Sequence, residues 1–205
     1  MSTGPVVVVL AAGKGSRFAA PSHKLAQTMG ATTVLGATLA RVIESQLPLV
    51  VVTTAGLAAD AARVVATRDV LVLSEVEAAR GMGHSIAAGV AERADADGWL
   101  VLPADMPLVQ PATLRAVARE LPSHAVVFAQ HGGRRGHPVG FSAELFSELV
   151  VLSGDEGARR LLARYPAHGV EVGDPGILMD IDTVEDLAAA REAVPALAAQ
   201  RLAVR

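Results

Sequence analysis

The chain has 205 residues, of which 51% are hydrophobic but only 3% aromatic, and its formal net charge is −3. Its core must therefore be built from Ala, Val and Leu, which suits helices packed on a buried parallel sheet. The scattered basic residues give no footprint for nucleic acid, and the absence of cysteine excludes disulfides, thiolate metal sites and a cysteine nucleophile. No segment resembles a signal peptide or a membrane helix, so we expect a cytoplasmic protein without membrane contact.

Short β-branched runs alternate with Ala- and Leu-rich helical patterns along the chain. In chain order, the predicted strands are Val6–Leu10, Leu49–Thr53, Val70–Leu73, Trp99–Leu102, Ala125–Ala129 and Gly169–Val172. The predicted helices are Val34–Ser45, Leu57–Ala66, His84–Arg93, one that begins at Pro111, Ser142–Val151, Asp155–Arg164 and Val184–Ala193. Strands separated by helical stretches are typical of βαβ units with right-handed crossovers. The pattern predicts an α/β fold, a three-layer αβα sandwich around a mostly parallel sheet.

Two segments depart from this alternation. The segment His131–Pro138 is polar and rich in glycine, which predicts a loop or the tip of a hairpin. Pro195 is expected to end the last helix, so that residues 195–205 form a tail that is either a short appended helix or frayed. Because no linker, repeat or low-complexity tract divides the chain, we expect residues 1–194 to form a single domain.

The first candidate site is the segment Leu10-Ala-Ala-Gly-Lys-Gly-Ser-Arg-Phe18, which follows the first predicted strand. Ligands of an open parallel sheet bind beyond the carboxyl ends of its strands, which is where this segment lies. Two glycines let backbone N–H groups approach an anion closely, and three basic residues add positive charge. The predicted phosphate-binding residues are Leu10, Ala11, Ala12, Gly13, Lys14, Gly15, Ser16, Arg17 and Lys24.

The spacing in this segment excludes two familiar phosphate-binding loops. A dinucleotide fingerprint would need glycine where Phe18 stands, and a Walker loop would need Gly-Lys-Ser/Thr after four intervening residues. The competing interpretation is a solvated turn between a strand and a helix. We favour phosphate binding because the position at a strand end and the charge density coincide.

Two aspartate motifs supply candidate metal ligands. Asp105 lies in Leu102-Pro-Ala-Asp-Met-Pro107, at another strand end, and could hold Mg²⁺, which takes one or two carboxylates together with phosphate oxygens. Asp180 and Asp182 point the same way if their segment is extended. We expect Asp182 to bind the metal and leave the role of Asp180 open, although Asp182 or Thr183 could instead cap the following helix.

Two further glycine-rich stretches are weaker candidates. Gly81 and Ser85 lie where a predicted helix begins, so backbone groups there could approach a base or a phosphate. An ordinary helix start explains the pattern equally well. His137, Asp155 and Arg159 belong to two other motifs that could face a second substrate, with His137 or Arg159 meeting an anionic group, although a histidine beside proline is more often structural.

Taken in order, these motifs resemble the MobA-like NTP transferases. The resemblance rests on Leu-Ala-Ala-Gly-x-Gly-x-Arg-Phe, a following lysine, Gly-Met-x-x-Ser, Ala-Asp-Met-Pro-Leu-Val, Gly-x-Pro-Val, Gly-Asp-x-Gly-Ala-Arg and Asp-Ile-Asp-Thr-x-Glu-Asp. It extends from Val6 to about Ala190. Within that family, the molybdenum cofactor cytidylyltransferases are the most similar group. Two stretches depart from their pattern, Phe18–His23 and the pair Gly83-His84, which affects the detailed loop conformation and the base preference.

The resemblance implies a Rossmann-like nucleotidyltransferase fold and transfer of a nucleoside monophosphate from an NTP to a phosphorylated acceptor. It implies that Arg17 and Lys24 act on the triphosphate and that Asp105 and Asp182 bind Mg²⁺. Ala12 favours CTP, since guanylyl-transferring relatives tend to carry glycine there. The implied acceptor is molybdopterin, with a molybdoenzyme or its chaperone as a partner. The alternatives are guanylyl transfer, a sugar-phosphate or other metabolite acceptor, and a non-catalytic nucleotide-binding chaperone.

Overall fold

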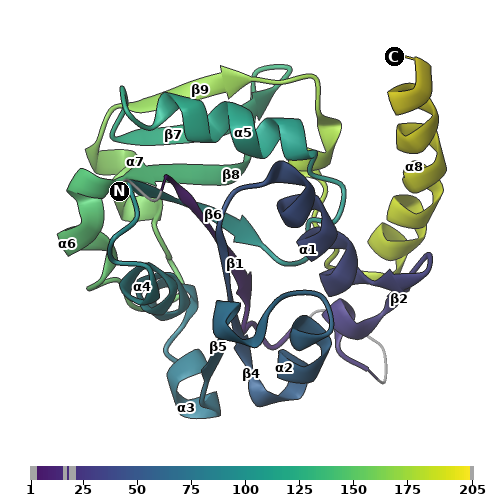
Figure 1. The fold of residues 1–205 in the computed structure, drawn as a ribbon, viewed down its shortest axis with the longest axis horizontal. Coiled ribbons are helices and arrows are strands. Elements are labelled where there is room, and N and C mark those ends of the chain that lie inside the picture. The colour runs from purple at the N-terminus through teal and green to yellow at the C-terminus, as the bar shows by residue number, and fades with distance from the viewer. Residues whose placement is uncertain (1–3, 16–17, 19–21, 204–205) are drawn as a thin grey trace.

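A seven-stranded sheet forms the centre of the molecule, with helices on both faces (Figure 1). The computed structural model describes residues 4–15, 18 and 22–203. The strands are β1 (Val6–Ala11), β4 (Leu49–Thr54), β5 (Val70–Leu73), β6 (Gly98–Pro103), β7 (Val126–His131), β8 (Arg134–Ser142) and β9 (Ala167–Glu171). Their order is β5-β4-β1-β6-β8-β7-β9, and β8 runs antiparallel to both of its neighbours while the other pairings are parallel. The predicted three-layer α/β fold with a mostly parallel sheet is confirmed.

Each face of the sheet has its own core. Successive side chains of β1 point to opposite faces, so that Val7 and Val9 belong to one buried cluster and Val6 and Val8 to the other. The first cluster is covered by α1 (Val34–Ser45), α2 (Ala55–Ala62), α5 (Pro111–Glu120) and α8 (Val184–Ala203). The second is covered by α4 (Met82–Glu92), α6 (Phe146–Leu149) and α7 (Arg159–Arg164), with the short α3 (Glu75–Ala78) beside α4. Burial of both faces explains why the central strands β1, β4 and β6 are hydrophobic almost throughout rather than alternating.

The largest difference from the sequence prediction is β8. We expected His131–Pro138 to be a loop or hairpin tip, but only Gly132 and Gly133 form the turn, with φ of +56° and +75°, as a tight two-residue hairpin requires. From Arg134 onward the chain is a strand that extends to Ser142. The predicted helix Ser142–Val151 is correspondingly shorter, comprising a 3-10 turn at Ala143–Leu145 and then α6.

Smaller differences concern the ends of elements. The predicted helix Asp155–Arg164 begins only at Arg159, since the glycines before it, at positive φ, form turns. Pro195 does not end the last helix, because α8 continues to Ala203. A proline removes one amide donor, and the Ala- and Leu-rich sequence after it favours the helix. No helix in the described part of the chain is long and apolar enough to cross a membrane.

Short elements that the sequence analysis did not predict complete the fold. The described residues include a two-stranded hairpin, β2 (Thr28–Met29) and β3 (Thr32–Thr33). They also include 3-10 turns at Lys24–Ala26, Thr67–Asp69 and Pro175–Leu178. The first of these turns places Lys24 at the carboxyl edge of the sheet, next to the candidate site.

Candidate active site

A cleft of about 920 Å³ opens beyond the carboxyl ends of β1 and β6. Almost all the site residues predicted from the sequence line it: Leu10, Ala12, Gly13, Lys14, Gly15, Lys24, Gly81, Ser85, Asp105, His137, Asp155, Arg159, Asp180 and Asp182. Ala11 does not line the cleft, because its side chain points into the core below. Ser16 and Arg17 lie outside the described residues. The separate sequence motifs therefore converge on one site.

The glycine-rich loop after β1 is folded back against the following turn. The Nε2 atom of His23 lies 2.9 Å from the Gly13 carbonyl oxygen, while the Leu25 amide donates to Nδ1 at 3.2 Å. This pair of bonds requires the tautomer with hydrogen on Nε2. Gly15 has a φ of +60°, and its carbonyl accepts from the amide of Phe18, whose ring is buried in the core. His23 thus fixes the loop from one side and Phe18 from the other.

Three hydrogen bonds to backbone atoms hold the loop that carries Asp105. The Ala104 amide donates to the Leu10 carbonyl at 3.0 Å, and the Thr38 hydroxyl donates to the Ala104 carbonyl at 2.7 Å. The amide of Ile181 donates to the Asp105 carbonyl at 3.0 Å. These bonds place Asp105 beside the end of β1 and bring the segment that contains Asp182 next to it.

Lys24 joins the two aspartates. Its ammonium nitrogen lies 2.6 Å from Asp105 Oδ2 and 2.8 Å from Asp182 Oδ1. Burial alone would lower the pKa of Lys24, but the charge of Asp105 and the hydrogen bonds to both carboxylates outweigh it, so the pKa lies above its usual value of 10.5. The lysine is therefore a fully charged cation between two carboxylates at neutral pH.

The carboxylates of Asp105 and Asp182 fit a divalent cation. One oxygen of Asp105, Oδ1, is buried and has no hydrogen-bond partner, which is costly for a carboxylate unless a ligand completes its surroundings. Oxygen donors of this kind suit hard cations such as Mg²⁺. The cap of α8 is made by Thr183, whose hydroxyl accepts from the Asp186 amide at 3.1 Å, so helix capping does not engage the carboxylate of Asp182.

The loops around Gly81 and Gly154 meet at another part of the cleft wall. The Gly83 amide donates to the Gly154 carbonyl and the Gly154 amide donates to the Arg80 carbonyl, both at 2.8 Å. Gly81 has a φ of +95°, and a Cβ atom there would lie 2.4 Å from the backbone of Gly154. Only glycine meets both conditions. This contact brings the predicted motifs around Gly81 and Asp155 into one surface.

The hairpin of β7 and β8 forms the end wall of the cleft. It contributes His137 together with Arg134 and Arg135, two cations that the sequence analysis did not single out. Arg135 stacks on the Phe128 ring at 4.0 Å. Burial lowers the pKa of His137, against the opposing charge of Asp105, so its ring is neutral at neutral pH. Its Nδ1 atom is buried without a hydrogen-bond partner.

This site has counterparts among known proteins. Residues 7–170 match the family model described as the MobA-like NTP transferase domain, which covers most of the chain. The chain belongs to this family. It is accordingly a nucleotidyltransferase-type enzyme that uses a nucleoside triphosphate, as the motif order indicated.

Individual relatives agree with the family. The chain is 39% identical over 123 residues to the purine catabolism protein PucB of Bacillus subtilis (strain 168), a match that covers 58% of this chain and 60% of PucB. The crystal structure of Rv0371c from Mycobacterium tuberculosis H37Rv has a TM-score of 0.80 and 32% identity, covering 94% of this chain and 99% of that one. A nucleotidyl transferase from Methanothermobacter thermautotroptrophicus has a TM-score of 0.78 and 27% identity, covering 93% and 97%.

A second structure of the mycobacterial protein is a complex with manganese. It has a TM-score of 0.77 and 31% identity, and the match covers 94% of this chain and all of that one. The similarity therefore extends over nearly the whole fold.

Two contributions to the site had no clear signal in the sequence. His23 belongs to no recognised motif, and nothing in its sequence position indicates that its ring forms a hydrogen bond to the glycine-rich loop. Arg134 and Arg135 lie in the segment predicted to be a loop or the tip of a hairpin, and no motif linked their charges to the cleft. A cue was available in the Gly132-Gly133 pair, which favours a tight hairpin and hence a strand on each side.

Proposed function

We propose that this protein transfers a nucleoside monophosphate from an NTP, with CTP preferred, to a phosphorylated acceptor of the molybdopterin class and releases pyrophosphate. The single observation that carries the proposal is the convergence of Lys24, Asp105 and Asp182 at the mouth of a glycine-rich loop. A cationic half for the triphosphate and an acidic half for a divalent cation then lie in one cleft. A protein that only bound nucleotides would have less need of the paired carboxylates.

The chemistry needs no nucleophile from the protein. An oxygen of the acceptor phosphate forms a bond with the α-phosphorus, while the bond from that phosphorus to the bridging oxygen breaks and its electron pair leaves with pyrophosphate. An acceptor phosphate is already an anion near neutral pH, so no strong general base is required. Catalysis is then a matter of positioning and of stabilising negative charge.

The residues of this chain have distinct roles in the proposal. Amides of the loop at Gly13 and Gly15 hold phosphate oxygens, and Lys24 and Arg17 stabilise charge on the leaving pyrophosphate. Lys14, Gly81 and Ser85 contact the rest of the nucleotide. Lys24 therefore has two states: without nucleotide it neutralises the carboxylates, and with nucleotide its ammonium turns to the phosphates.

Asp105 and Asp182 would hold the divalent cation. When bound, such a cation neutralises phosphate charge and polarises the α-phosphate. We propose Mg²⁺, because both donors are carboxylates and the buried Oδ1 of Asp105 otherwise has no partner. The manganese complex of the mycobacterial relative supports a divalent cation in this fold.

The acceptor is assigned to the end of the cleft formed by β8 and α7. Arg159 would bind the acceptor phosphate, and Asp155 would accept a hydrogen bond from the acceptor. The neutral ring of His137 would contact a polar group of the acceptor. The base preference rests on Ala12, whose small side chain lines the cleft where glycine would leave more room.

The name of the relative PucB points to purine catabolism as a setting for this activity.

A panel of the four ribonucleoside triphosphates tests the proposal. Each is incubated with Mg²⁺ and with molybdopterin or a sugar phosphate, and release of pyrophosphate is measured. We expect release with CTP and molybdopterin, and a loss of about a hundredfold or more in Asp105→Asn. The matched control is Asp60→Asn, which removes a surface carboxylate paired with Arg63 on α2. Tight NTP binding without pyrophosphate release for every acceptor would instead support a nucleotide-binding chaperone.

A further inference from the structure

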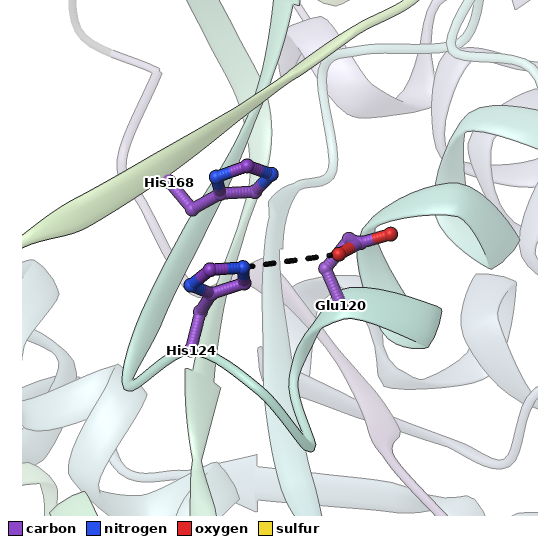
Figure 2. A group of neighbouring side chains, drawn as sticks. All are labelled: Glu120, His124 and His168. Carbon is purple, nitrogen blue, oxygen red and sulfur yellow. Dashed lines mark ion pairs between the residues drawn. The ribbon is translucent and has the colours of Figure 1, made fainter.

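Three side chains with metal-binding atoms gather far from the cleft. Glu120, His124 and His168 each offer one ligand atom, and these atoms all lie within 4.8 Å of one another (Figure 2). The carboxylate of Glu120 and Nε2 of His124 are 3.9 Å apart. The rings of His124 and His168 are stacked, with 4.0 Å between centroids and 4° between planes. No residue of the cleft takes part, so the cluster needs its own explanation.

The fold brings these residues together from three elements. Glu120 is the last residue of α5, His124 lies in the turn that leads into β7, and His168 is in β9, the edge strand of the sheet. His168 pairs in register with Val127, whose side chain faces the same helical layer as α5. The cluster thus lies at the amino end of β7, whereas the cleft opens at the carboxyl ends of the strands.

The chemistry of the donors selects the class of metal. Two imidazoles and one carboxylate suit Zn²⁺ and similar divalent transition metals, whereas Mg²⁺ and Ca²⁺ prefer oxygen donors alone. Since the chain has no cysteine, no thiolate competes for such a metal. Three protein ligands leave a fourth position for water in a tetrahedral arrangement.

The stacked rings must move slightly to act as ligands. The nitrogen lone pair of an imidazole lies in the plane of its ring, so the lone pairs of two parallel rings run parallel and do not converge on one point. One ring therefore has to tilt before both nitrogens can bind the same ion. His168 is the ring with room to do so, because it is exposed on the edge strand, while Glu120 and His124 are partly buried. All three residues are accessible to an ion from solvent.

We propose that Glu120, His124 and His168 form a second metal site, for Zn²⁺ or a similar divalent transition metal, that ties β9 to the end of α5. The site is structural rather than catalytic, because it lies at the opposite end of the strands from the cleft. A metal bound only to the folded chain stabilises the fold by an amount that grows with the logarithm of its concentration relative to its dissociation constant.

Calorimetric titration of the untagged, metal-free protein with ZnCl₂ tests this site. The background is Asp105→Asn with Asp182→Asn, so that the two carboxylates proposed to hold the cation of the cleft do not contribute. We expect one zinc ion per chain, and an affinity that falls about tenfold or more in His124→Ala and in His168→Ala. The control is His84→Ala, a histidine on α4 at the other face of the sheet.

A second measurement keeps the test independent of folding defects. His168 is exposed, so His168→Ala should melt at the same temperature as the parent protein in EDTA. With a hundredfold excess of Zn²⁺ over its dissociation constant, the parent should melt about 5 °C higher or more, and the variant should not. Absence of zinc binding, or zinc binding that survives loss of both histidines, would overturn the proposal.

Discussion

The ammonium nitrogen of Lys24 lies 2.6 Å from Oδ2 of Asp105, although the two residues are 81 positions apart in the chain. The same nitrogen reaches Asp182, 158 positions away. The lysine of the phosphate-binding side and the carboxylates of the metal-binding side therefore form one charged unit. Any change to one member alters the surroundings of the other two.

Removal of the Lys24 ammonium should destabilise the fold and make its stability depend on divalent cations. In Lys24→Met, the largely buried carboxylates of Asp105 and Asp182 lose the ammonium group that lies between them, and we expect the free energy of unfolding to fall by about 1–3 kcal/mol. Urea unfolding at pH 7.5 measures this loss. Millimolar Mg²⁺ should recover part of it in the variant and change the parent protein less. Equal stability of variant and parent without metal would contradict this account of Lys24.

The contact at Gly81 should control nucleotide binding. In Gly81→Ala the new methyl group collides with the backbone of Gly154, so the two loops must separate, and we expect KM for the NTP to rise about tenfold or more. The matched control is Gly30→Ala in the turn between β2 and β3, which has a similar positive φ of +63° but nothing within 4 Å of its Cβ position. Both variants should lose stability from backbone strain, but only the first should lose affinity. An unchanged KM in Gly81→Ala would show that the two loops do not shape the site.

Helix α4 is pressed closely against the sheet, and this contact should be visible in stability. A Cβ atom at Gly89 would lie 2.5 Å from Val8 Cγ1 and 2.8 Å from Val52 Cγ2, both on buried strands. Overpacking should outweigh the gain in helix propensity, so that Gly89→Ala lowers the free energy of unfolding by about 1–2 kcal/mol. Gly56→Ala in α2, where nothing lies within 4 Å, should raise it by about 0.5–1 kcal/mol. Chemical denaturation of the pair checks both signs, and a gain in both variants would refute the close contact.

The Glu171 carboxylate should make the stability of the β7–β8 hairpin depend on pH. It accepts hydrogen bonds from the Gln130 side chain at 3.0 Å and the Gly132 amide at 2.6 Å, and these bonds hold its pKa below the usual 4.5. A lowered pKa means that the charged form stabilises the folded state above about pH 4.5, and that this contribution disappears as pH falls through the lowered pKa. The stability difference between the parent and Glu171→Gln should therefore be constant from pH 6 to 8 and shrink below pH 4.5. A difference independent of pH would exclude the charged carboxylate as its cause.

Local patterns predicted the part of the molecule around β1 well, because its strands and the predicted site residues at their ends follow one another along the chain. β1, β4 and β5 are continuous apolar runs, and the loop after β1 combines glycines with charge, so both strand and site could be read from neighbouring residues. The acidic residues at the ends of β6 and before α8 were identified for the same reason. The sequence could not predict how close Lys24 lies to Asp105 and Asp182, because these residues come together only when the sheet forms.

The part of the sheet formed by β7, β8 and β9 was less predictable for a physical reason. The first residues of β8 are polar because they face a cleft, and a polar, glycine-rich strand looks like a loop when only its sequence is considered. One of its pairing partners, β6, comes from a distant part of the chain, and the Gly132-Gly133 turn that joins β8 to β7 is the one local cue for a strand here. The position of His23 over the glycine-rich loop is a tertiary contact of the same kind.

The antiparallel strand β8 divides the sheet into two blocks of different origin in the chain. The strands on one side of it, β5, β4, β1 and β6, all come from the part of the chain that ends at Pro103. The end wall of the cleft comes from one continuous stretch, from β7 to β9. We expect that this stretch can be diversified as one unit if β8 keeps its pairing with β6 and Gly154 keeps its contacts with Arg80 and Gly83. Under the proposed function, such a scaffold would keep its NTP site while the group that receives the nucleotide changes.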